Sequence, residues 1–228
     1  MYQNEMKKFL AECFGTFCRV FAGTGAIIIN DISGGSVTHV GVALTFGLVV
    51  LSIIYAVGDI SCAHLNPAVT IGFFAAHRFS GRFVLPYIVS QSSGALAAGF
   101  LLPGLFRSHG SLGATLPTGS DAQSFILELV LTAILMFVIL RVCSGSRERG
   151  ITAGIVVGSV IALEALFAGP ICGASMNPAR SFAPALVLGQ YSSLWIYLAA
   201  PTIGALLGVG LCRCMREEGR CASTKKID

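Results

Sequence analysis

Charged side chains are scarce in this chain of 228 residues. Asp, Glu, Lys and Arg together make up 11% of it, whereas 54% of the residues are hydrophobic. Soluble proteins average about 25% charged residues, and so few charges cannot cover a globule of this size with a polar surface. The composition therefore excludes an ordinary water-soluble domain and favours a membrane protein.

Residues that commonly form catalytic or metal sites are also few and dispersed. The histidines stand far apart and form no set with a nucleophile or with paired acids. They are His39, His64, His77 and His109. Cys212 and Cys214 lack the Cys-x-x-Cys spacing of a zinc or redox site, and the eight cysteines suggest no disulfide framework. We therefore expect no enzyme, no metal site and no cofactor.

Long apolar runs, by contrast, are abundant. Six of them approach the ~20 residues that a helix needs to cross ~30 Å of hydrocarbon. They are 9–30, 40–57, 83–106, 125–142, 151–170 and 194–212. The first run leads into a glycine-rich loop without an evident cleavage site, so we expect it to remain in the mature protein. The runs predict an all-α membrane protein with six transmembrane helices.

Basic residues gather on one side of this predicted topology. They are Lys7, Lys8, Arg78, Arg82, Arg141, Arg147, Arg149, Arg213, Arg216, Arg220, Lys225 and Lys226. Only Arg107 and Arg180 fall on the other side. Because cytoplasmic segments carry the excess of Lys and Arg, we expect both termini, with a basic tail, on the cytoplasmic side of the cell membrane. The net charge of +4 then reflects topology and attraction to the lipid bilayer, not a nucleic-acid partner.

The chain matches itself at an offset of about 110 residues. Residues 64–70 (HLNPAVT) correspond to residues 175–181 (SMNPARS), and Glu12 and Glu128 lie at matching places before apolar stretches. Three spans are an odd number, so the second half must cross the membrane in the opposite sense to the first. We predict a single domain, 1–228, made of inverted repeats 1–110 and 111–228. Such repeats build a central site in many membrane transport proteins.

Each matching segment contains the triplet Asn-Pro-Ala, at Asn66 and at Asn177. Asn is a favoured helix N-cap and Pro suits the first turn, so 70–76 and 181–188 are predicted as short helices that do not cross the membrane. Non-helical backbone at membrane depth survives only when it is buried in protein or lines a water path. The two half-helices therefore predict a pore with Asn66 and Asn177 as central donors, and with carbonyls of 58–64 and 169–175 as acceptors.

These features resemble the major intrinsic protein family of aquaporins and glycerol channels. The resemblance covers nearly the whole chain and rests on both triplets, on Arg180 after the second, and on the three-span halves. The stretch 168–181 (AGPICGASMNPARS) is most similar to plant nodulin-like intrinsic proteins and their bacterial relatives, and short termini suggest a bacterial version. The resemblance implies passive permeation of water and small neutral solutes, exclusion of ions and protons, and a homotetramer.

By the same resemblance, Phe46, Ala165, Ala174 and Arg180 form an outer constriction. Water-selective relatives place His at the position of Ala165 and Thr or Cys at that of Ala174. Two methyl groups widen the opening beside the guanidinium, which favours glycerol, urea or a metalloid hydroxide such as arsenious acid (arsenite). Ser181, however, stands where glycerol facilitators carry Asp, so a water-selective aquaporin remains the alternative.

Buried polar residues complete the candidates. Matching places and the resemblance favour Glu12 and Glu128 as acceptors for the backbone of the re-entrant loops, with a proton relay as the alternative. His64 is expected to bond to the backbone nearby, with a pH gate as the alternative. Glu164 is the acid that a transporter's coupling-ion site would use. Arg19 stands where the family usually has an apolar residue, and snorkelling or a contact with a neighbouring subunit both remain open.

Overall fold

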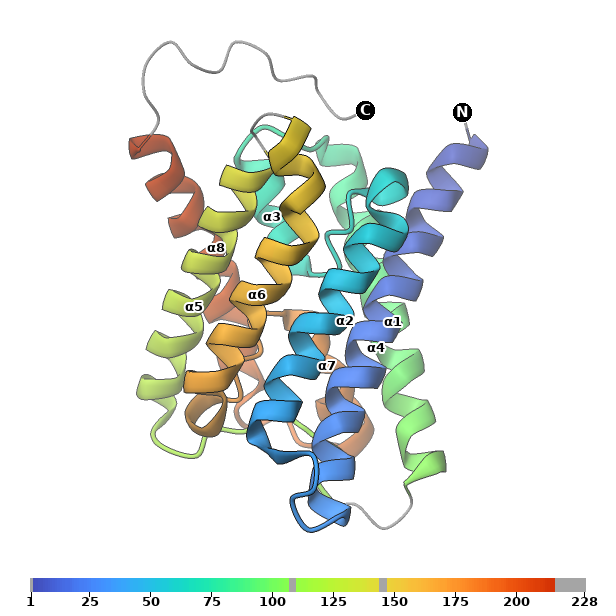
Figure 1. Ribbon diagram of the computed structural model, residues 1–228, viewed down its shortest axis with the longest axis vertical. Helices are drawn as coiled ribbons and strands as arrows, with labels where there is room; N and C mark the ends of the chain where they lie inside the picture. Colours follow the sequence, from blue (N-terminus) through green and yellow to red (C-terminus); the bar gives the residue numbers. More distant parts are fainter. Residues whose placement is uncertain (1, 107–109, 144–146, 216–228) are drawn as a thin grey trace.

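The computed structural model describes residues 2–106, 110–143 and 147–215. They form eight helices (Figure 1): α1 (Tyr2–Ile32), α2 (Thr38–Ser61), α3 (Pro67–Ala75), α4 (Gly81–Leu105), α5 (Asp121–Val142), α6 (Arg147–Cys172), α7 (Pro178–Leu188) and α8 (Leu194–Cys214). All except α3 and α7 are long and apolar enough to span a membrane. The described residues contain no β-strand, and the predicted all-α architecture with six spans is confirmed. The basic tail 216–228, Arg107 and His109 lie outside the described residues, as do the side chains of Arg147 and Arg149.

The six long helices stand side by side, and the two short helices lie among them in opposite halves of the bundle (Figure 1). In the first half α1 packs against α4, and in the second half α5 packs against α8 in the same way. The halves meet where α2 packs against α6. The first turns of α1 and the last turns of α8 reach the same end of the bundle (Figure 1). This is the predicted inverted arrangement of two three-span halves.

Both short helices begin earlier than predicted. α3 starts at Pro67 and α7 at Pro178, three residues before the predicted starts at positions 70 and 181. In each case Asn is the N-cap and Pro is the first helical residue, where its missing N–H leaves no hydrogen bond unmade. In each triplet, Asn therefore caps the short helix, and Pro and Ala are the first two residues of the helix.

The backbone repeats itself in the loop before each short helix. Positive φ angles occur at Cys62, Ala63 and Leu65 in the first loop, and at matching places, Gly173, Ala174 and Met176, in the second. A left-handed conformation costs a residue other than Gly about 1–2 kcal/mol. Five such residues persist here because partners described below hold both loops in place.

Glycines bring the long helices together at three crossings. A Cβ atom at Gly94 of α4 would lie 1.9 Å from the Cys13 carbonyl oxygen of α1, and one at Gly204 of α8 would lie 2.3 Å from the Leu129 oxygen of α5. Where α2 crosses α6, Gly47 and Gly158 face one another. In a lipid bilayer no hydrophobic driving force brings helices together, so their association depends on close packing, which small residues allow. The backbones can therefore approach closely enough to fix the frame around the two loops.

Candidate functional site

The two asparagines meet at the centre of the bundle and bind each other's loop. The Asn66 Nδ2 donates to the Met176 carbonyl oxygen (2.7 Å), and the Asn177 Nδ2 donates to the Leu65 carbonyl oxygen (2.8 Å). Their Oδ1 atoms cap the short helices by accepting from the backbone N–H of Ala68 and Ala179. Both side chains are fully buried.

This exchange leaves one N–H on each asparagine amide. An amide nitrogen carries two hydrogens, and one of them is used by the opposite loop. The remaining hydrogen of each amide lies where two helix N-termini converge, each with a partial charge of roughly half a proton charge. The centre is therefore rich in donors and positive potential.

Glu12 of α1 holds the first loop from behind. Its Oε1 accepts from the Ser61 hydroxyl (2.7 Å) and the His64 N–H (2.9 Å), and its Oε2 accepts from the Leu65 N–H and the Gln91 amide, both at 2.7 Å. Hydrogen bonds to charged groups contribute about 1.5–3 kcal/mol each. An acid at the centre of a membrane helix costs about 2.5–3.5 kcal/mol, so four such contacts offset its burial.

Glu128 of α5 does the same for the second loop. Its two oxygens accept from the backbone N–H of Ser175 (2.6 Å) and Met176 (2.7 Å). A pair of tyrosines extends the symmetry, because the Tyr87 hydroxyl donates to the Ser61 carbonyl (3.0 Å) and the Tyr197 hydroxyl to the Cys172 carbonyl (2.8 Å). Each half thus carries a glutamate and a tyrosine that hold its loop.

The acceptors along the loops are fewer than predicted. Residues 58–61 and 169–172 still belong to α2 and α6, and the carbonyls of Gly58 and Gly169 accept the N–H groups of Cys62 and Gly173. In the described part of the chain, we find no donor on six loop carbonyls. They belong to Cys62, Ala63, His64, Gly173, Ala174 and Ser175. At least these three carbonyls in each half are therefore available to a passing molecule.

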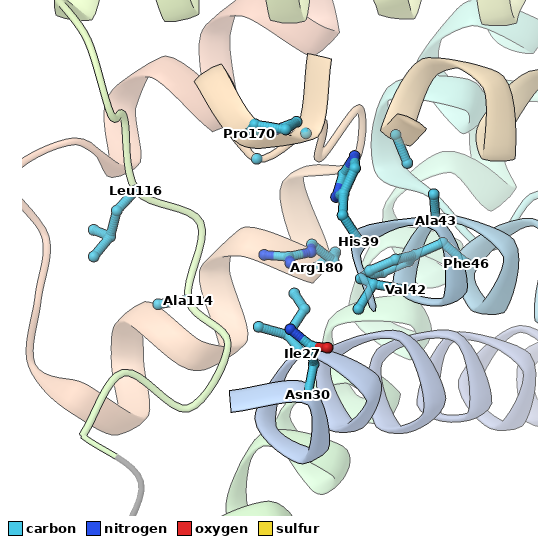
Figure 2. A pocket seen from close by; sticks show the side chains of 13 residues that line it. Ile27, Asn30, His39, Val42, Ala43, Phe46, Ala114, Leu116, Pro170 and Arg180 are labelled. Carbon is cyan, nitrogen blue, oxygen red and sulfur yellow. The ribbon is translucent and has the colours of Figure 1, made fainter. Parts of the chain in front are cut away.

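A cavity of about 380 Å³ opens beside Arg180, at the end of the bundle away from the termini. This Arg180 cavity is lined by Ile27, Asn30, His39, Val42, Ala43, Phe46, Ala114, Leu116, Ala165, Gly169, Pro170, Gly173 and Arg180. The Arg180 Cζ lies 5.4 Å from the centre of the Phe46 ring. Figure 2 shows the guanidinium directed toward the loop that carries Ala114 and Leu116. A fixed charge therefore faces walls that are largely apolar.

Three of the four predicted constriction residues line this cavity: Phe46, Ala165 and Arg180. Ala174 does not line it, but it belongs to the same buried cluster as Phe46 and Ala165. Its neighbour Gly173 lines the cavity instead. The four positions therefore lie close together, and three of them line the cavity.

Thr115 is a member of the site that sequence reasoning missed. Arg180 donates to the Thr115 hydroxyl through a guanidinium N–H. That hydroxyl also pairs with the Ser181 hydroxyl (2.8 Å), which in turn pairs with that of Ser175 (2.6 Å). Thr115 lies in a loop and is far in sequence from either Asn-Pro-Ala motif, so no feature of the sequence assigned it to the site. His39 was also missed; its Nε2 lies 2.6 Å from the Leu166 carbonyl oxygen at the cavity mouth.

A second cavity, of about 50 Å³, lies on the termini side of the asparagines. This Arg19 cavity is lined by Arg19 of α1, by Cys62, Ala63 and His64 of the first loop, by Cys143 after α5, and by apolar residues of α2, α3, α5 and α6. Desolvation by surrounding protein atoms and, to a smaller degree, the nearby Cys62 thiol raise the pKa of Cys143 to about 11. Cys143 therefore stays neutral at physiological pH.

His64 is held by aromatic rings and by one hydroxyl. Its ring stacks on Phe73 with 4.5 Å between centroids and also contacts Phe79 and Tyr87. Its Nδ1 lies 3.1 Å from the Thr70 hydroxyl. The predicted bond from the His64 ring to the backbone is therefore replaced by a bond to a side chain, while the His64 backbone N–H binds Glu12.

Glu164, the acid that a coupled transporter would use, is 1% exposed and lines neither the Arg180 cavity nor the Arg19 cavity. Among the described residues, no group of three His, Cys, Asp or Glu side chains is placed to hold a metal ion.

Comparison with known proteins gives one family. The model of the major intrinsic protein family matches residues 2–211. Aquaporin NIP1-1 of Zea mays is 48% identical over 204 residues, which are 89% of this chain and 72% of the maize protein. Nodulin-26 of Glycine max is 42% identical over 204 residues, covering 89% and 75% of the two chains.

A solved structure agrees with these relatives. The aquaglyceroporin from Plasmodium falciparum matches with a TM-score of 0.81 and 27% identity, over 91% of this chain and 95% of that one. The sequence relatives named here are plant proteins, and they lend no support to the expected bacterial version. The chain belongs to the major intrinsic protein family, and it is a multi-pass membrane channel for water and small solutes, not an enzyme.

Proposed function

We propose that the channel passes water together with small uncharged solutes that combine hydroxyl or amide groups with some apolar bulk. Glycerol, urea and metalloid hydroxides such as arsenious acid have this character. The observation that carries the proposal is the wall of the Arg180 cavity, where Phe46 faces the guanidinium and Ala165 contributes only a methyl group. A solute can accept a hydrogen bond from the Arg180 guanidinium while the carbon atoms of the solute lie against the Phe46 ring.

The centre of the pore excludes cations and protons in this proposal. Asn66 and Asn177 each offer one amide hydrogen to a passing oxygen, and both helix N-termini raise the energy of a positive charge there. Water that accepts from both asparagines cannot pass a proton along a chain. The six loop carbonyls supply acceptors on either side of this point, but too few to replace the hydration shell of an ion.

Orientation and assembly belong to the same proposal. The described basic residues Lys7, Lys8, Arg78, Arg82 and Arg213 lie in the segments at the termini end of the bundle, which supports cytoplasmic termini. Large apolar side chains are exposed on all six spans, as lipid contact and a homotetramer both require. The Arg180 cavity then opens to the outside of the cell.

The alternative is a water-selective aquaporin. Ser181 favours it, because the Ser181 hydroxyl belongs to the Thr115 network that fixes Arg180 and no acid stands there to draw the guanidinium aside. A fixed guanidinium occupies part of the opening and leaves less room for glycerol.

Stopped-flow light scattering on proteoliposomes separates the two functions. Vesicles are mixed with a hypertonic solution of sucrose, glycerol, urea or arsenite, with protein-free vesicles as the control. The proposal expects fast shrinkage in every case, followed by reswelling within seconds in glycerol and urea but not in sucrose. Fast shrinkage without protein-dependent reswelling in any permeant solute would establish the water-selective alternative.

A further inference from the structure

Arg19 places a second guanidinium in the cavity beside the first loop. It lies in the middle of α1, is 3% exposed, and lines the Arg19 cavity. It therefore neither snorkels to the membrane surface nor faces a neighbouring subunit, which were the two explanations open from the sequence. A charge at the centre of a membrane helix is rare and marks ion or substrate pathways when it faces a cavity.

Among the described residues, no acidic side chain lies at hydrogen-bond distance from this guanidinium. Its Nε has no hydrogen-bond partner among the described residues. The charges that act on it are Arg180, of the same sign, and Glu128. Glu128 already accepts a backbone N–H on each oxygen, from Ser175 and Met176. Arg19 therefore adds to the positive potential of the pore without a dedicated partner.

The rest of the cavity is suited to an anion. Its described lining contains no Asp or Glu, and Cys143 is neutral at physiological pH. Val50, Leu135 and Val157 provide apolar walls, which lower the local dielectric constant and so strengthen electrostatic attraction. A volume of about 50 Å³ holds a few water molecules, since one needs roughly 10–15 Å³ of such space.

We propose that the Arg19 cavity binds a small planar monovalent oxyanion, of the size of nitrate or formate, through the Arg19 guanidinium. The planar fork of an arginine matches two oxygens of such an ion. A bound ion fills a cavity that lies in the pathway, so it obstructs water. The obstruction rests on the proposed channel function, whereas the binding itself does not.

Binding is tested on the purified protein in detergent, by thermal unfolding in nitrate and in gluconate at equal ionic strength. Gluconate is too bulky for the cavity. A ligand of the folded state raises the unfolding temperature in proportion to ln(1 + [L]/Kd). We expect nitrate to raise it by several degrees in the wild type and not in Arg19→Leu. Arg19→Lys, which keeps the charge without the fork, should show a smaller shift.

Arg82→Leu is the matched control, because it removes an exposed arginine from the same end of the bundle and should keep the full nitrate shift. Absence of a nitrate shift in the wild type would overturn the proposal, even if the leucine variant fails to fold. An equal shift in wild type and Arg19→Leu would overturn it as well.

Water flux provides the second measurement. In proteoliposomes, nitrate on both sides should slow osmotic shrinkage of the wild type at least threefold relative to gluconate, and the effect should saturate. If the protein binds nitrate in detergent but its water flux in nitrate equals that in gluconate, the proposed obstruction of the pore would be refuted. A wild type without water flux in gluconate would refute the channel proposal and leave the binding result standing.

Discussion

Ala165 contributes a methyl group to the wall of the cavity that the Phe46 ring and the Arg180 guanidinium also line. It is 7% exposed and lines the Arg180 cavity from α6. Because α6 is a regular helix at this point, a longer side chain at the same position would be directed into the cavity. The width of the opening thus depends on one residue whose replacement leaves the backbone unchanged.

Ala165→His is therefore expected to narrow the pore and add a polar contact. Glycerol and urea fluxes should fall about tenfold, which corresponds to ~1.4 kcal/mol in the barrier, while water flux should fall less than threefold. Ala165→Ser, which adds a hydroxyl but little volume, serves as the control and should retain most solute flux. Reswelling rates in proteoliposomes provide the measurement, and equal losses of water and glycerol would show that Ala165 does not set the width.

At the scale of the helices, glycines at the helix crossings determine how closely the transmembrane helices can pack. Gly94 meets the Cys13 carbonyl of α1, and Gly204 meets the Leu129 carbonyl of α5. In both cases the obstacle to a Cβ atom is backbone, which cannot rotate away as a side chain can. The carboxylates Glu12 and Glu128 extend from these same helices, so the crossings also set the positions of the two loops.

Gly204→Ala is expected to destabilise the fold by about 1–3 kcal/mol, as overpacking usually does. Gly210→Ala in the same helix is the matched control, because nothing lies within 4 Å of its added Cβ. Alanine is the better helix former by about 1 kcal/mol, so Gly210→Ala should be neutral or stabilising. Unfolding temperatures in detergent provide the comparison, and an equal effect of the two substitutions would contradict the close approach of α8 to α5.

At the scale of the whole molecule, charge is distributed unequally between the two ends. Arg78 donates to the Leu140 carbonyl at the end of α5 (2.9 Å), and Arg213 donates to the Ala75 carbonyl at the end of α3. Arginines on the termini side therefore satisfy carbonyls that a helix end leaves without a partner. They stabilise the fold and, in the proposed orientation, would also favour retention of this face in the cytoplasm.

The orientation is tested by fusing reporters to the C-terminus. A fluorescent protein that folds only in the cytoplasm should be bright there, and a phosphatase that is active only outside should be inactive. Replacing Lys7 and Lys8 by Gln removes part of the charge bias and should lower this preference measurably. An active phosphatase fusion on the unmodified chain would reverse the proposed topology and place the Arg180 cavity inside the cell.

The sequence predicted what depends on short-range patterns. Apolar runs predicted the six spans, and the Asn-Pro-Ala triplets predicted two short helices, although not their first residues. Contacts between distant segments were harder to predict, because no sequence motif near Thr115 indicates that its hydroxyl accepts a hydrogen bond from Arg180. The inward direction of Arg19 could not be read either, since α1 contacts other helices on several sides and only the packed bundle shows which face borders the cavity.

The exchange at the centre, in which Asn66 binds the Met176 carbonyl and Asn177 binds the Leu65 carbonyl, means that neither half is a smaller version of the whole. If the chain were cut between α4 and α5, each fragment would contain one asparagine amide and one loop carbonyl without a hydrogen-bond partner, and the lipid could not supply one. The fragments therefore regain a complete filter only by docking with one another, and a substitution at either asparagine loosens the loop contributed by the other.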